Sequence, residues 1–391
     1  MDRARLPFRQ SGKRYTRKDK EKLPGQGRKI KKEKDMKAKK LVAILLLAAM
    51  VLTLTACGSS APEATTTEAP AVTATDAPTE NDPFASMKPV TLRLGHSHSE
   101  SEVPHEELVA MAERISERTN GKVTVEVYAS NSLGGNEDVL EQARLGTNIA
   151  QYCDPGRLDN YVPGVSAISA PYVVEGYDDI AALKNCPTVQ DWESRLENDF
   201  GLTVLAWNFC QGYRNIFATK GGTTPDDFKG VQLRSATAPV WVATVEALGA
   251  TPVALEFGEM YSGIQTKIVD GCEQNYGSIY NNAIYEVITT MTETRHVYLA
   301  NCVVVSSQWL RSLPQEAQDI LLEEFNLAGE KTSERLAELD DFYREEMVSK
   351  GMEVIPYEEL DIAAFKANAE TVYEKLNIVD AVDSLKADLG K

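Results

Sequence analysis

The sequence lacks the short motifs that mark common enzyme classes. It contains no G-x-S-x-G elbow, no P-loop, no G-x-G-x-x-G loop and no H-E-x-x-H pair. Only four histidines are present, and the six cysteines include no C-x-x-C pair, so no metal constellation is expected. We therefore expect no cofactor, no metal and no catalytic residue. An enzyme built on a carboxylate pair stays an alternative, because acidic residues are abundant.

Basic residues are scarce beyond residue 56. Residues 1–56 hold 17 of the 41 Lys and Arg but 5 of the 58 Asp and Glu, which leaves 24 basic and 53 acidic residues in the remainder. Nucleic-acid binding depends on clustered Lys and Arg, so this acidic remainder argues against a nucleic-acid partner. An anion-binding site in such a chain is expected to be a local positive spot in a negative field.

Long hydrophobic runs are also missing. The longest, residues 41–54, has fourteen residues, which is too short to span a bilayer comfortably and fits the core of a signal peptide. The run follows a basic stretch and leads into Ala56-Cys57-Gly58, an order that resembles the bacterial lipoprotein box. That resemblance implies cleavage before Cys57 and attachment of lipid to its thiol. The alternative is a buried apolar helix with an incidental cysteine.

The N-terminal region divides by composition. Met36 begins a signal peptide of normal length, so we interpret residues 1–35 as a basic extension produced by a wrong start, with a real extension as the alternative. Residues 36–56 are the predicted lipoprotein signal peptide. Residues 57–88 are the predicted lipidated cysteine and disordered tether, because Ala, Thr, Pro, Ser and acidic residues bury little apolar surface. The expected location is extracytoplasmic, lipid-anchored to the outer face of the cell membrane, or periplasmic.

After this tether, strand and helix patterns alternate. The expected strands are residues 91–95, 123–128, 231–234 and 251–255. Helices are expected to open near Pro104 and at Pro239, and residues 314–350 form a long, strongly charged helical stretch. Strand–helix–strand order with short connections predicts an α/β fold with a mainly parallel sheet. Two such lobes facing each other would make a cleft that closes on a solute.

Arg234 is the first candidate binding residue. It stands at the carboxyl end of an expected strand and just before a helix, the edge at which α/β sheets bind ligands. A guanidinium there can hold a carboxylate through two parallel hydrogen bonds. Ser235 and Thr237 would add donors. By pattern alone the same arginine also suits a surface ion pair.

Four stretches in one order carry a family resemblance. They are Phe228-Lys-Gly-Val-Gln-Leu-Arg234, Ala247-Leu-Gly-Ala-Thr-Pro252, Glu259-Met-Tyr261 and Val269-Asp-Gly-Cys-Glu273. They resemble the extracytoplasmic solute-binding proteins of tripartite ATP-independent periplasmic (TRAP) transporters, and the similarity covers about residues 89–375. The resemblance implies a two-lobed, periplasmic-binding-protein-like clamshell with a long helix crossing both lobes. Lobe I is predicted as 89–211 plus about 300–339, and lobe II as about 212–299 plus 340–391.

The resemblance also implies roles for individual residues. An arginine at the position of Arg234 holds the ligand carboxylate in that family, and Arg214 matches a second, upstream arginine whose alternative role is an ion pair with an acidic surface residue. Gln274 stands where the family often has a ligand-binding Asn. Because Asn275 follows, either amide is a candidate. Glu273 is expected to orient its neighbours or to cap structure.

Two further candidates carry weaker arguments. His96, with His98, follows the first strand and faces either the cleft or an exposed loop. Tyr276, near Asn281, would suit a sugar ring, or belong to an ordinary turn. The remaining cysteines are Cys153, Cys186, Cys210, Cys272 and Cys302. Most are expected to be buried free thiols, with one disulfide as the alternative.

The resemblance implies capture of a small organic acid, either a sugar acid such as a hexuronate or a C4-dicarboxylate. The predicted partners are the carboxylate solute, TRAP membrane permease subunits, and the membrane through the lipid on Cys57; the protein is expected to be a monomer. The alternative function is a lipoprotein that presents its solute to a sensor receptor.

Overall fold

The computed structural model describes residues 83–391, and its first strand group is parallel. Strands β1 (Val90–Gly95), β2 (Val123–Tyr128) and β3 (Ile149–Cys153) pair in the order β2-β1-β3. Helix α2 (Val103–Arg118) connects β1 to β2, and α3 (Asn136–Arg144) connects β2 to β3. Residues Asn120 and Gly121, which end the turn after α2, adopt positive φ angles that Asn and Gly tolerate best.

The second group repeats this arrangement. Strands β5 (Gln232–Ser235), β6 (Thr251–Ala254) and β7 (Gly271–Gln274) pair in parallel in the order β7-β5-β6. Helix α6 (Pro239–Ala247) begins with a proline, whose missing N–H is not needed in a first helical turn. Helices α7 (Met260–Gln265) and α8 (Tyr276–Asn281) flank β7 in sequence.

Two seventeen-residue strands join the groups into one sheet. Strands β4 (Leu202–Ala218) and β8 (Thr290–Ser306) pair with each other along their length, β8 with β3 and β4 with β7, all antiparallel. The expected parallel pairing is therefore confined to the two outer groups and to β8 with β9 (Glu353–Ile355). The β4–β8 ladder shifts register at several places, including between Cys210 and Gly212, and such bulges bend a strand where it passes between the groups.

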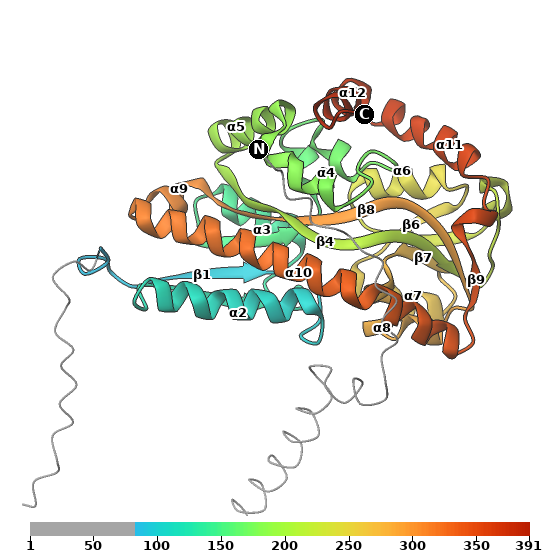
Figure 1. The fold of residues 1–391 in the computed structure, drawn as a ribbon, viewed down its shortest axis with the longest axis horizontal. Coiled ribbons are helices and arrows are strands. Elements are labelled where there is room, and N and C mark those ends of the chain that lie inside the picture. The colour runs from blue at the N-terminus through green and yellow to red at the C-terminus, as the bar shows by residue number, and fades with distance from the viewer. Residues whose placement is uncertain (1–82) are drawn as a thin grey trace, which may run out of the picture. The chain divides into compact units, whose positions relative to one another are not determined.

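A long helix covers one face of this sheet (Figure 1). Helix α10 (Gln315–Ser349) contacts α2 in the first group, α8 in the second and β4 between them. Ser333 on α10 accepts a hydrogen bond from the backbone N–H of Cys210 at 2.9 Å and donates to the carbonyl of Asn208 at 2.7 Å. Gly329 suits this close approach, because a Cβ there would collide with the side chain of Asn208. The predicted two-lobed α/β clamshell with a helix crossing both lobes is confirmed.

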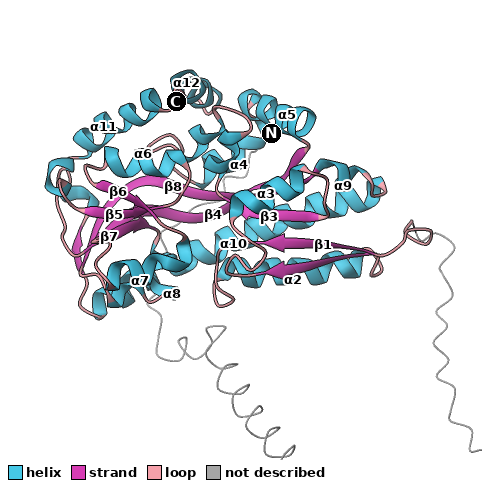
Figure 2. Cartoon of the chain, turned by 180° about the vertical axis from the view of Figure 1, so that it is seen from behind, coloured by secondary structure: helices cyan, strands magenta, loops and turns pink. Residues whose placement is uncertain are grey.

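The remaining helices of six residues or more lie on the other face (Figure 2). They are α4 (Tyr177–Ala182), α5 (Pro187–Phe200), α11 (Ile362–Lys375) and α12 (Val379–Asp388), while the short α9 (Ser307–Arg311) follows β8. Helix α11 packs on α6 of the second group, and α12 packs on α5 beside the first. The exact division of the chain between the lobes stays a prediction.

The N-terminal expectations fall mostly outside the described residues. The extension 1–35, the signal peptide 36–56 and Cys57 all lie there, as does most of the segment 57–88. Phe84 is already buried in the same apolar cluster as Leu92 of β1. Within residues 83–391, no helix is both long enough and apolar enough to cross a membrane.

Candidate functional site

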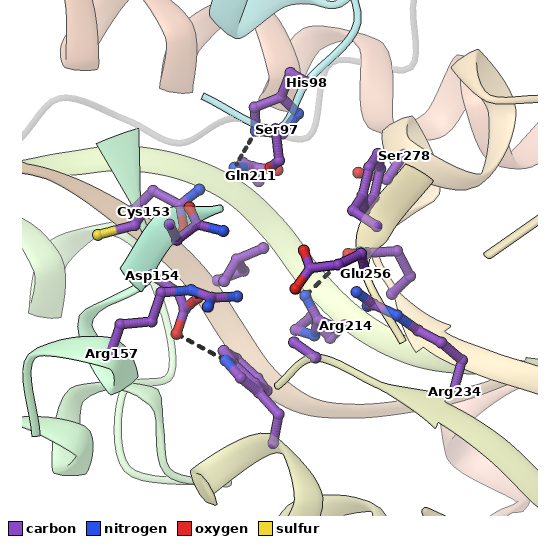
Figure 3. A pocket seen from close by; sticks show the side chains of 17 residues that line it. Ser97, His98, Cys153, Asp154, Arg157, Gln211, Arg214, Arg234, Glu256 and Ser278 are labelled. Atoms are coloured by element: carbon purple, nitrogen blue, oxygen red, sulfur yellow. Dashed lines mark hydrogen bonds and ion pairs between the residues drawn. The ribbon is translucent and has the colours of Figure 1, made fainter. Parts of the chain in front are cut away.

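A cavity lies where the two strand groups face each other (Figure 3). The segments that follow β1 and β3, the end of β7 and the middle of β4 and β8 all contribute to its wall. Most of its side chains are polar, and three are buried arginines: Arg157, Arg214 and Arg234. The carboxylates of Asp154 and Glu256 also belong to the lining, so the wall of the cavity carries both signs of charge.

Arg214 is held firmly at the floor of the cavity. Its Nη2 donates to Glu273 Oε1 at 2.6 Å and to the Glu273 carbonyl at 2.8 Å, and its Nε donates to the same carboxylate. Its Nη1 donates to Gln274 Oε1 at 2.9 Å. The guanidinium carbon lies 4.4 Å from the centre of the Trp241 ring, within cation–π range. The acidic partner of Arg214 is thus a buried residue and not a surface residue.

Glu273 orients its neighbours. Its side chain is 0% exposed, and its Oε2 lies 3.3 Å from His296 Nε2. Burial alone would raise the pKa of Glu273, but Arg214 and His296 outweigh burial and hold that pKa at about 2. Burial lowers the pKa of His296, whose Nδ1 pairs with Thr294 Oγ1 at 2.8 Å. Of the two roles considered for Glu273, the structure favours orientation of neighbours.

Arg234 differs from Arg214 in having almost no partner. Its Nε donates to the Leu255 carbonyl at 2.9 Å, whereas its Nη1 and Nη2 have no hydrogen-bond partner among residues 83–391. The residue is 3% exposed. Burial, reinforced by the charge of Arg214 and only partly offset by Glu273, lowers the pKa of Arg234 to about 10. A buried, undercompensated guanidinium that lines a cavity is suited to receiving an anion.

Arg157 was not predicted from the sequence. It lies in the 3₁₀ helix Pro155–Asn160 directly after β3, where its Nε donates to Asp154 Oδ2 at 2.8 Å and its Nη1 to Thr237 Oγ1 at 3.1 Å and to Glu137. Burial would lower the pKa of Arg157, but Asp154 and Glu137 raise it. The available signal was the same as for Arg234, a polar residue just beyond the carboxyl end of a buried strand.

Contacts across the cavity connect the two strand groups. Asp154, after β3, accepts a hydrogen bond from Trp241 Nε1 on α6 at 2.7 Å. Arg157 reaches Thr237, which precedes α6, and Asn282 Nδ2 lies 3.4 Å from Glu102 Oε1. These contacts hold the first group against the second around the cavity.

The structure separates the two candidate amides. Gln274 lines the cavity, and its Nε2 has no partner among the described residues. Asn275 does not line the cavity; it caps α8, with its Oδ1 accepting from the Ser278 N–H at 2.8 Å. Its Nδ2 donates to Gln211 Oε1 at 3.2 Å. Gln274, and not Asn275, is therefore the amide that lines the cavity.

His98, and not His96, lines the cavity. His96 is fully buried behind it, with Nε2 3.0 Å from His105 Nδ1, and burial together with the nearby His98 and His105 lowers the pKa of His96 to about 2. His98 pairs with Glu102 at 3.0 Å and lies 3.3 Å from Gln211 Nε2. The course of the loop after β1 determines which of the two histidines faces the cavity, and a single sequence does not specify that course.

Tyr276 also lies away from the cavity wall. Its hydroxyl donates to Glu293 Oε1 at 2.8 Å, and its ring packs edge-on against Phe217 in an apolar cluster. Tyr276 and Asn275 thus stabilise α8. No group of three or more His, Cys, Asp or Glu within residues 83–391 is arranged to hold a metal ion.

Residues 94–378 match the family model described as bacterial extracellular solute-binding protein, family 7. The ectoine-binding periplasmic protein TeaA of Halomonas elongata is 28% identical over 312 residues, which cover 75% of this chain and 89% of TeaA. The C4-dicarboxylate-binding periplasmic protein DctP of Vibrio cholerae is 26% identical over 265 residues, 66% of this chain and 79% of DctP.

Solved structures of solute-binding proteins are also similar to this chain. A TRAP periplasmic solute-binding protein from Escherichia fergusonii, in an apo open structure, is 31% identical with a TM-score of 0.68, covering 76% of this chain and 99% of its own. Another from Ochrobacterium anthropi, with bound L-fuconate, is 26% identical with a TM-score of 0.72, covering 77% of this chain and 99% of its own.

Proposed function

This chain belongs to family 7 of the bacterial extracellular solute-binding proteins, and we propose that its cavity captures a small organic acid through an ion pair between Arg234 and the solute carboxylate. One observation carries the proposal: Arg234 is buried at the cavity, and its Nη1 and Nη2 are unpaired within residues 83–391. A carboxylate would satisfy both nitrogens with parallel hydrogen bonds. The names of two relatives support the ligand class, because both a C4-dicarboxylate and L-fuconate carry a carboxylate.

The other two arginines support this ion pair in different ways. Arg214 donates most of its hydrogen bonds to Glu273 and Gln274. It therefore stabilises the floor of the cavity and contributes positive potential there. Arg157 uses Nε and Nη1 on protein partners, and its Nη2 has none among the described residues. Arg157 Nη2 and Gln274 Nε2 are therefore donors for the remainder of the solute.

Closure around the solute is the proposed mechanism. The Asp154–Trp241 and Arg157–Thr237 hydrogen bonds join the strand groups when the cleft is shut. A bound solute would touch Arg234 on one side and the segment after β3 on the other. Such a solute stabilises the shut form, because its affinity for the shut form is higher than its affinity for an open form. Exclusion of water then strengthens each polar contact.

A polyhydroxy monocarboxylate is the proposed solute, with a hexuronate as the example and a C4-dicarboxylate as the second candidate. The cavity offers amide and hydroxyl groups from Asn136, Ser278 and Asn301 as well as Gln274. These groups pair with sugar hydroxyls, whereas a second carboxylate needs a second free cation. Tyr276, which had suggested a sugar from the sequence, supports α8 instead, and Asn275 caps that helix.

Anchoring and delivery are part of the proposal. Cys57 would carry the lipid, and the closed, loaded protein would deliver its solute to TRAP membrane permease subunits. The charge of -17 in the whole sequence favours a soluble monomer that does not bind nucleic acid. Presentation of the solute to a sensor receptor is the alternative use of the same binding step.

A thermal-shift screen tests the ligand class. Hexuronates, other sugar acids, C4-dicarboxylates and the matching neutral sugars are compared, because a solute that binds only the folded state raises Tm. We expect a rise with at least one organic acid and none with its neutral counterpart. Equal shifts with a neutral sugar and its acid would contradict the carboxylate pair.

A further inference from the structure

Cys153 and Cys302 lie directly opposite each other at the cavity end of the β3–β8 pair. Both are buried, at 2% and 0% exposure, and Cys302 Sγ lies 3.4 Å from the carbonyl oxygen of Cys153. Directly opposed residues of antiparallel strands have Cα atoms about 4.5–5.5 Å apart. That spacing falls within the range of disulfide bridges, about 4.4–6.8 Å.

We propose that this pair is an oxidation site, which forms a cross-strand disulfide when the protein meets a disulfide oxidant outside the cytoplasm. The relatives TeaA and DctP are periplasmic, and disulfides persist in such compartments. The structure indicates which two of the five cysteines can form a disulfide, a choice that the sequence left open. Cys210 opposes Ala300 on β8, so it is only a diagonal neighbour of Cys302, and diagonal positions are about 7–8 Å apart.

The chemistry is thiol–disulfide exchange in two steps. During folding, the thiolate of Cys153 attacks one sulfur of the oxidant and forms a mixed disulfide while one oxidant thiolate leaves. The thiolate of Cys302 then attacks the Cys153 sulfur and releases the second. The two cysteines lose two electrons and two protons, and the oxidant disulfide becomes two thiols.

The folded, shut protein resists this reaction. Burial and the neighbouring Cys153 thiol raise the pKa of Cys302 well above its ordinary value, which leaves little thiolate. Exchange is therefore expected to be slow in the shut form and faster during folding. Once formed, the bridge closes the chain from 153 to 302, a span of 149 residues, which contains Arg234 and Trp241. It also fixes the end of β3 immediately before Asp154 and Arg157.

The test uses the full chain in a Cys57→Ser background, so that five thiols remain. The denatured, reduced protein is refolded with and without glutathione disulfide, alkylated and mapped by mass spectrometry. We expect a mass lower by two hydrogen atoms before alkylation, a peptide joining Cys153 to Cys302, and a Tm higher by a few degrees that dithiothreitol reverses.

Matched variants identify the pair. Cys302→Ser or Cys153→Ser should abolish both the cross-linked peptide and the Tm rise, whereas Cys186→Ser, at the start of α5, should leave both unchanged. Five alkylated thiols after refolding with oxidant would overturn the proposal. So would a bridge between another pair, or glutathione that stays on Cys153 because Cys302 does not displace it. None of these outcomes depends on which solute binds.

Discussion

Arg214 of β4 and Glu273 of β7 form a buried ion pair, with side chains 5% and 0% exposed, at the floor of the cavity. Because Glu273 takes most of the donors of Arg214, the positive charge left for a solute is that of Arg234, on the adjacent strand β5. Arg214 therefore holds the floor of the cavity in place, whereas Arg234 carries the charge that is available to a solute.

Glu273→Gln is expected to destabilise the protein at pH 7 by about 3–5 kcal/mol, because it leaves the buried charge of Arg214 without a countercharge. The folded-state pKa of Glu273 is about 2 against an ordinary value of 4.5. The unfolded chain therefore binds this proton first, and the stabilisation is present above about pH 4.5 and lost as the pH falls toward 2.

Denaturant unfolding from pH 7 to pH 2, followed by tryptophan fluorescence, checks this prediction. The wild type should lose stability more steeply below pH 4.5 than Glu273→Gln does. Glu141→Gln is the control, since it breaks the exposed pair with Arg144 and should leave the profile nearly unchanged. If the free energy of unfolding fell in parallel with pH for the wild type and Glu273→Gln, the buried pair could not be the source of the acid sensitivity of the wild type.

The adjacent amides should separate into two phenotypes. Gln274→Ala removes a cavity donor, together with the acceptor of Arg214 Nη1, and is expected to weaken solute binding by about 1–2 kcal/mol. Asn275→Ala removes the cap of α8 and is expected to cost about 1 kcal/mol of stability. Asn275→Ser retains a capping oxygen and should recover most of that loss. Calorimetric titration measures the loss of affinity, and thermal unfolding measures the loss of stability. A loss of affinity in Asn275→Ala and a loss of stability alone in Gln274→Ala would contradict the prediction.

Trp241→Phe tests the contacts that shut the cleft. The Phe ring still covers Arg214, but the hydrogen bond to Asp154 is lost, so the shut form is disfavoured and solute affinity should fall about tenfold. Small-angle scattering should show a larger radius of gyration without solute. Trp207→Phe removes a similar 2.7 Å bond to Glu193 away from this cavity and is the control. An equal loss of affinity in both variants would contradict the prediction.

Cys57→Ser tests the anchor. If Cys57 carries lipid, the wild type partitions with membranes and takes up labelled fatty acid, whereas the variant does neither. Cys186→Ser should behave as the wild type, because Cys186 belongs to the folded part of the chain. Membrane partition of Cys57→Ser equal to that of the wild type would show that the anchor lies elsewhere.

The sequence specified local structure well where the pattern was regular. Alternating residues in Val123–Tyr128 predicted β2 at its exact bounds, and the residues expected as a long helix, 314–350, form α10. Arg234 became a candidate because a strand end followed by a helix is a local signal, and the family resemblance then implied its place in the cleft. Pairing between distant segments was harder to predict. The bulged strands β4 and β8 were not predicted, and their antiparallel ladder pairs residues that are 72 positions apart at Ala218 and Thr290 and 104 positions apart at Leu202 and Ser306.

The sequence did not reveal which hydrogen-bond partners the candidate side chains of the site have. Arg214 and Arg234 look alike in sequence, but Glu273 lies within reach of the Arg214 donors and satisfies them. His96 and His98 are separated by one residue, and the bend after β1 turns only His98 to the cavity. Such choices depend on packing between segments that are distant in the chain.

The most direct measurement is the affinity of Arg234→Ala for the organic acid found in the screen, by isothermal titration calorimetry. We predict a loss of about 2–5 kcal/mol relative to the wild type, an intermediate loss for Arg234→Lys, which keeps the charge but not the paired donors, and no loss for the surface variant Arg144→Ala. The unliganded Tm of Arg234→Ala should not fall, because burial already disfavours this charge. Binding of the acid by folded Arg234→Ala as tightly as by the wild type would contradict the account.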